Sequence, residues 1–98
     1  MVKKEIVSHN VDGNSSIKIE VPTTAKEIHV KKISVASDNE VSFDVRVGQQ
    51  YNYQNAVCVF EDEEFRCLTE DNKIMMEIFN NSSASTKFKI ELDYNKLL

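Results

Sequence analysis

Val41-Ser-Phe-Asp-Val-Arg-Val47 and Lys87-Phe-Lys-Ile-Glu-Leu-Asp93 alternate apolar and polar residues without a break. A β-strand turns successive side chains to opposite faces, so this period of two predicts strands with one buried and one solvated face. Such strands are typical of antiparallel sheets, because parallel sheets are usually buried on both faces. These two segments therefore predict an antiparallel β protein.

The same alternation recurs along the rest of the chain. The predicted strands cover residues 2–8, 16–22, 27–36, 41–47, 56–61, 64–69, 73–80 and 86–93. Strands that follow one another about every ten residues are typical of sandwiches and barrels. We therefore expect residues 1–98 to form one all-β domain, a single antiparallel, jelly-roll-like β-sandwich of about eight strands.

The segment 27–36 breaks its own period. Ile28 and Val30 share one parity, whereas Ile33 and Val35 share the other. One inserted residue would restore the core-facing direction, so we predict a β-bulge near Lys31-Lys32. The alternative is two separate short strands.

Turn chemistry predicts which strands pair. Ser37-Asp38-Asn39 suits a three-residue hairpin loop, in which Asn takes the left-handed position. This hairpin would set Ile33 opposite Phe43 and Val35 opposite Val41. Residues 81–85 would join the last two strands in the same way. The resulting pairs are Ile78 with Phe88, Met76 with Ile90 and Ile74 with Leu92.

A third predicted hairpin contains both cysteines. A turn at Asp62-Glu63 places Cys58 opposite Cys67, close enough for a cross-strand disulfide. The alternative, favoured in a reducing cytoplasm, is a pair of buried thiols. The nine-residue spacing, with no second Cys or His pair, argues against zinc.

Composition excludes several classes of function. The net charge is −4, from 12 Lys and Arg against 16 Asp and Glu, so no large positive field is present to neutralise phosphates. Nucleic acid is not an expected partner. The N-terminus lacks the apolar run of a secretory signal, and no apolar stretch is long enough to span a bilayer. We expect cytoplasmic synthesis without a signal peptide, with release by lysis if the protein is found outside a cell, and no membrane partner.

No residue cluster in the sequence predicts catalysis. His9 and His29 belong to no recognised catalytic or metal-binding motif, and the two glycines are too few for a phosphate-binding loop. The run Glu61-Asp62-Glu63-Glu64 lacks the ligand spacing and the glycine of a calcium loop. We therefore expect no enzymatic activity, no cofactor and no metal.

The segment from Gly48 to Asn55 is uncharged and rich in tyrosine and amide side chains. Tyrosine supplies apolar contact area and amides supply adaptable hydrogen bonds, a mixture suited to recognition. The candidate binding residues are Gln49, Gln50, Tyr51, Asn52 and Tyr53. The alternative is a polar linker whose tyrosines pack on the edge of the sandwich.

Charge is distributed unevenly along the chain. Residues 61–71 carry six acids and one arginine, whereas residues 1–32 carry six lysines and four acids. Opposite patches could dock between molecules, and two leucines end the chain as an apolar tail. The candidate interface residues are Lys31, Lys32, Glu61, Asp62, Glu63, Glu64, Leu97 and Leu98. The alternative is that each charged patch only keeps the protein soluble.

These expectations favour a non-catalytic structural module for assembly or attachment. In strand number and alternation the chain resembles the small β modules that build or decorate virus particles, which implies a capsid, decoration or tail component in a virion. We expect the partner to be the protein itself, as a homo-oligomer, or another structural protein. The alternatives are a carbohydrate-binding module that holds a glycan at Tyr51 and Tyr53, and a cytoplasmic partner-binding domain.

Overall fold

The computed structural model describes residues 2–49 and 51–97, and the side chain of Tyr51 lies outside the description. Eight strands are present in these residues: β1 (Lys3–Val11), β2 (Ser16–Pro22), β3 (Glu27–Ser37), β4 (Ser42–Val47), β5 (Tyr51–Val57), β6 (Val59–Leu68), β7 (Lys73–Asn80) and β8 (Thr86–Lys96). Every pairing between them is antiparallel. No helix in the described part of the chain is long and apolar enough to cross a membrane.

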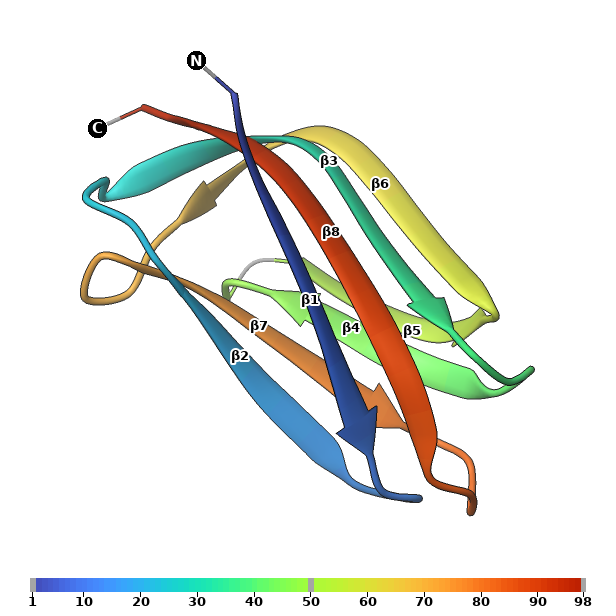
Figure 1. Cartoon of the computed structure of the whole chain (residues 1–98). Helices are drawn as coiled ribbons and strands as arrows, with labels where there is room; N and C mark the ends of the chain where they lie inside the picture. The colour runs from blue at the N-terminus through green and yellow to red at the C-terminus, as the bar shows by residue number, and fades with distance from the viewer. Residues whose placement is uncertain (1, 50, 98) are drawn as a thin grey trace.

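The strands form two four-stranded sheets stacked face to face (Figure 1). One sheet has the order β1-β8-β3-β6 and the other the order β5-β4-β7-β2. A single residue pair, Val57 with Val59, joins β5 to β6 where the chain passes between the sheets. The expected fold class, an all-β, jelly-roll-like sandwich of eight antiparallel strands, is confirmed.

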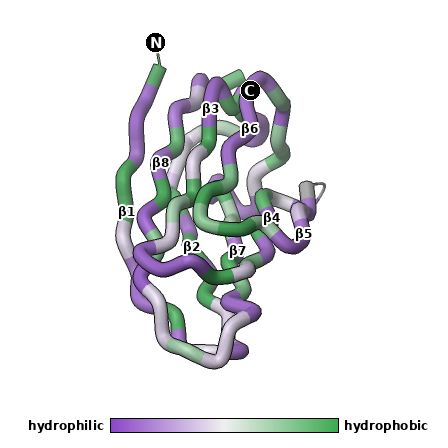
Figure 2. The backbone as a smooth tube through the Cα atoms, turned by 90° about the vertical axis from the view of Figure 1, so that its right-hand side faces the viewer, coloured by the Kyte–Doolittle hydropathy of each residue, from purple (hydrophilic) through white to green (hydrophobic). Residues whose placement is uncertain are grey.

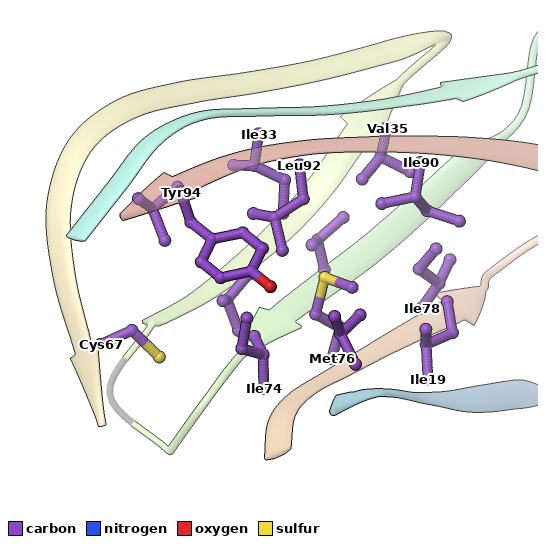
Figure 3. Close-up of a cluster of buried hydrophobic side chains, with 14 of the residues drawn as sticks. Ile19, Ile33, Val35, Cys67, Ile74, Met76, Ile78, Ile90, Leu92 and Tyr94 are labelled. Atoms are coloured by element: carbon purple, nitrogen blue, oxygen red, sulfur yellow. The ribbon is translucent and has the colours of Figure 1, made fainter. Parts of the chain in front are cut away.

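Apolar side chains from both sheets meet in the space between them. Figure 3 shows Ile33 and Leu92 of one sheet pointing toward Ile74 and Met76 of the other. The colouring of the backbone in Figure 2 alternates along the strands, because each strand turns its apolar residues inward and its polar residues outward. Two buried polar side chains, Asn80 and Thr86, are placed among the core residues.

The predicted hairpins between consecutive strands are wrong. β3 pairs with β6 and β8, whereas β4 pairs with β5 and β7, so Ile33 and Phe43 lie in opposite sheets. The same correction applies to Met76 of β7 and Ile90 of β8. All four side chains are buried, as the alternation predicts. Apolar side chains pack together equally well when they face each other across the core and when they lie side by side on paired strands. Apolar matching alone therefore could not identify which strands pair.

The predicted bulge in the third strand is confirmed. The register between β3 and β8 shifts between Val30 and Lys32. The extra residue is Lys31, and it lets the apolar residues on both sides of it face the core. Ile28, Val30, Ile33 and Val35 are all buried.

The predicted cysteine hairpin is wrong. Asp62 and Glu63 lie inside the continuous strand β6, and the turn falls instead at Cys58, which has a φ of 64°. Cys58 is exposed before the start of β6, whereas Cys67 is buried near its end. The two residues lie nine positions apart along one run of strand, much farther than the Cα separation of about 7 Å that a disulfide can span. Both cysteines are free.

Candidate interaction surfaces

The segment predicted as a recognition loop is mostly a strand. Residues 51–57 form β5, at the edge of its sheet. Gln49 lies in the preceding turn, where its Nε2 donates to Glu70 Oε1 over 3.2 Å. Asn52 is exposed and Tyr53 is half-buried, because neighbouring residues in a strand face opposite ways. Gln50 and the side chain of Tyr51 lie outside the described residues.

Tyr53 connects the two sheets. Its hydroxyl donates to Asp62 Oδ2 of β6, and its ring centroid lies 4.5 Å from that of Phe60, also on β6. Together with the Val57–Val59 pair, these contacts tie β5 of one sheet to β6 of the other. For Tyr53 the structure agrees with a tyrosine that packs on the sandwich edge.

The opposite charges predicted to meet between molecules lie side by side within one chain. Lys31 and Lys32 belong to β3, and β6, which carries the four acids from Glu61 to Glu64, is its neighbour in the same sheet. Lys31 Nζ lies 3.2 Å from Glu64 Oε1, and His29 Nε2 lies 2.9 Å from Glu64 Oε2. The hydrogen bond from Lys31, with the positive charges of Lys31 and His29, holds the pKa of the Glu64 carboxyl below its usual value.

The outer face of this sheet carries one row of alternating charges. Lys4 of β1 is opposite Asp93 of β8, which is opposite Lys32 of β3, which in turn is opposite Glu63 of β6. Lys4 Nζ and Asp93 Oδ1 are 3.6 Å apart. Each of these charges therefore has an opposite charge beside it, as expected of a solvated face.

Charged side chains line several of the hollows on the surface. One, of about 470 Å³, is lined by Lys32 and the acids Glu61, Asp62 and Glu63. Ligand sites are usually concave and mostly apolar, with a few polar groups that fix orientation. Within residues 2–49 and 51–97, no group of three or more His, Cys, Asp or Glu side chains is placed to hold a metal ion.

The C-terminal leucine predicted as an anchor extends β8. The backbone N–H of Leu97 donates to the carbonyl of Glu27 over 2.9 Å, and the side chain is 40% exposed. Lys96, just before it, donates from Nζ to Thr24 Oγ1 over 2.8 Å. Leu98 lies outside the described residues.

The sheet edges differ in how well they are protected against pairing with another chain. β6 carries four acids and a backbone irregularity at Glu64, and β5 has a register shift and a positive φ at Asn55. Bulges and charges of this kind block edge-to-edge association. β1, in contrast, pairs with β8 over nine residues without a register shift, and its Ile6 is 54% exposed.

Sequence reasoning missed the importance of this first strand. The predicted fold was enough to place this strand at a sheet edge, because the first strand of a jelly roll lies at the edge of a sheet, as β1 does here.

No family model and no curated protein sequence matches the chain. The chain is similar in structure to a de novo designed double-stranded β-helix solved by NMR, with a TM-score of 0.56 and 10% sequence identity. The similarity covers 90% of this chain and 97% of the designed one. At this identity the comparison shows the fold, and the fold defines the class of protein: a jelly-roll-like, double-stranded β-helix.

Proposed function

We propose that this chain is a non-catalytic assembly module that associates with copies of itself through its sheet edges. The observation that carries the proposal is the β1 edge, nine residues long, without a register shift and with Ile6 exposed. Every second residue of such a strand turns its backbone N–H and C=O away from the sheet, which is a template for another strand. We also propose that the chain is a capsid, decoration or tail component of a virion, because its strand number and alternation resemble those of the small β modules in virus particles.

The carbohydrate-binding alternative receives no specific support from the described residues. Stacking on a sugar requires an aromatic ring face, and the Tyr53 ring packs against Phe60 while its hydroxyl bonds to Asp62. Gln49 is engaged with Glu70. Assembly therefore has the better support.

Sedimentation or light scattering over a range of concentrations tests the proposed function. We expect a particle mass that is a multiple of 11.2 kDa at high micromolar concentration. A mass of one chain at every concentration, at both low and high salt, would overturn the proposal.

A further inference from the structure

One lateral side of the sandwich is closed and the other is open. On the closed side β5 and β6 are tied by Tyr53 and by the Val57–Val59 pair. β1 and β2 are the two terminal strands of the order, and the turn at residues 12–15 joins them, so both free edges lie on the remaining side (Figure 1). Val7 of β1 and Ile17 of β2 pack against the core there and are only partly buried.

β1 is complementary to a second copy of itself. Antiparallel pairing about a two-fold axis at Val7 uses all nine residues of the strand, from Lys3 to Val11. This register sets Glu5 opposite His9 on both sides of the axis, a carboxylate facing a ring N–H donor. Lys4 then faces Asn10 and Ile6 faces Ser8, so no like charges are opposed.

β2 is complementary to itself as well. Pairing about a two-fold axis at Ile19 sets Lys18 opposite Glu20 on both sides of the axis and Ile17 opposite Val21. The only unfavourable position is Pro22, which lacks an N–H, and it falls at the end of the strand, where at most one hydrogen bond is lost on each side of the axis.

A single axis can serve both strands. Val7 lies four residues before the end of β1, and Ile19 lies three residues after the start of β2, so the two centres are at similar distances from the turn that joins the strands. A two-fold axis perpendicular to the sheets can therefore pass close to both. Two-fold symmetry of this kind produces a closed dimer, in which the β1 and β2 edges of both copies are paired.

We propose that two copies of this chain associate through the open side, β1 with β1 and β2 with β2, so that each four-stranded sheet becomes a continuous sheet of eight. The inference rests on the proposed function and specifies its interface. It also gives Val7 and Ile17 full burial, because each meets an apolar residue of the second copy: Val7 meets Val7, and Ile17 meets Val21.

Charge exchange between positions 18 and 20 tests this register. Lys18→Glu opposes two carboxylates in each pair and Glu20→Lys opposes two ammonium groups, so each variant alone should dimerise about tenfold or more weakly at low salt. A mixture of the two variants restores an opposite charge in both pairs. We expect the mixture to form a heterodimer in native mass spectrometry at the affinity of the parent protein.

Arg66→Glu is the matched control, because it makes the same change of charge at an exposed residue of β6, three strands from β1 in the same sheet. It should leave dimerisation unchanged. If the parent protein is oligomeric and the 18 and 20 variants behave like the control, the interface is elsewhere and this inference is wrong while the proposed function stands. A parent protein that is monomeric under all conditions contradicts both.

A cross-link at the axis gives a second measurement that does not depend on charge. Directly opposed residues of an antiparallel pair have Cα atoms within the range of a disulfide. Val7→Cys in a Cys58→Ser background should therefore form a disulfide-linked dimer under mild oxidation. Val57→Cys in the same background, exposed on the closed side, should not. Cross-linking of the closed-side variant alone would overturn the inference.

Discussion

Lys31 and Glu64 form an ion pair of 3.2 Å. At this point in both of their strands, the core-facing side chains change from even-numbered to odd-numbered residues (a change of parity). In β3 the parity changes between Val30 and Ile33, and in β6 it changes between Asp62 and Phe65. Glu64 has a φ of 58°, which accommodates the extra residue on β6. The two irregularities lie opposite each other, because the β3–β6 register is the same on either side of them. The paired bulge lets both strands bend together over the core.

The Glu64 carboxyl should titrate below its ordinary pKa of 4.5, because the hydrogen bond and charge of Lys31 favour the ionised form. A lowered pKa in the folded state means that this carboxylate stabilises the fold above pH 4.5 and that the contribution is lost as the pH falls through the folded pKa. Lys31→Met should raise the pKa of Glu64, as measured by NMR titration. Lys89→Met, at a distant ion pair, should leave it unchanged. Equal pKa values in the Lys31 variant and the parent would contradict the contact.

Phe43 should contribute far more to stability than Phe79, although the residue type is the same. Phe43 is fully buried with its ring 5.1 Å from that of Phe88 in an edge-to-face contact, whereas Phe79 is 41% exposed. Phe43→Ala should lower the free energy of unfolding by about 3–5 kcal/mol, and Ile90→Ala by about 2–5 kcal/mol. Phe79→Ala should change it by less than about 1 kcal/mol. Denaturant unfolding curves measure all three, and a similar cost at both phenylalanines would contradict the assigned faces.

Alternation in the sequence was enough to predict which residues face the core. Val41 to Val47 and Phe88 to Leu92 lie as their patterns predict, and the parity change at Ile33 revealed the bulge. Alternation shows only which side of the sheet a residue faces, however, and not which strand pairs with its own. The short turn at Ser37-Asp38-Asn39 predicted a hairpin, but in the structure residues 38–41 carry the chain from one sheet to the other.

The same limit explains the errors at β5 and β6. The hairpin turn predicted at Asp62-Glu63 lies within a run of four acids, and in the structure this run is part of the continuous strand β6. In the structure Asp62 points inward to the hydroxyl of Tyr53, a contact between sheets that no local pattern encodes. The uncharged residues before it formed a strand for the same reason: pairing with β4 outweighed their loop-like composition.

Gly48 should be difficult to replace, and Cys67 explains part of the cost. Gly48 has a φ of 60°, and a Cβ placed on it would lie 2.6 Å from the Cys67 sulfur. Gly48→Ala should therefore cost about 1–2 kcal/mol for the left-handed backbone, and more for the clash. Adding Cys67→Ala removes the clash, so the two substitutions together should cost at least about 0.5 kcal/mol less than the sum of their separate costs. Additive costs in denaturant unfolding would contradict the contact.

The two thiols should differ sharply in reactivity. Cys58 is exposed, whereas burial, with the nearby Glu70 carboxylate, raises the pKa of the Cys67 thiol to about 11. Since the thiolate is the reactive form, Cys67 should react slowly at neutral pH. Mass spectrometry after maleimide treatment should show one label on the folded chain, at Cys58, and two after denaturation. Protein purified without reductant should show no intramolecular disulfide, and finding one would contradict the continuous strand β6.

Asn80 should be the most sensitive polar position in the described core. Its Nδ2 donates to the carbonyls of Val11 and Ala84 over 3.1 and 2.9 Å, and its Oδ1 accepts from the backbone N–H and the hydroxyl of Ser82 over 2.9 and 2.7 Å. The amide thus ties the end of β1 to the connection between β7 and β8.

Asn80→Ala removes the Nδ2 donor to the buried Val11 carbonyl and leaves a cavity in the core, so we expect a loss of about 2–4 kcal/mol in the free energy of unfolding. Asn80→Asp should cost at least as much, because it sets a carboxylate against the same two carbonyls. Ser82→Ala removes only one partner of the network, and its cost should be about 1 kcal/mol. Urea unfolding of the three variants measures these costs, and an Asn80→Ala protein no less stable than the Ser82→Ala protein would contradict the role assigned to the amide.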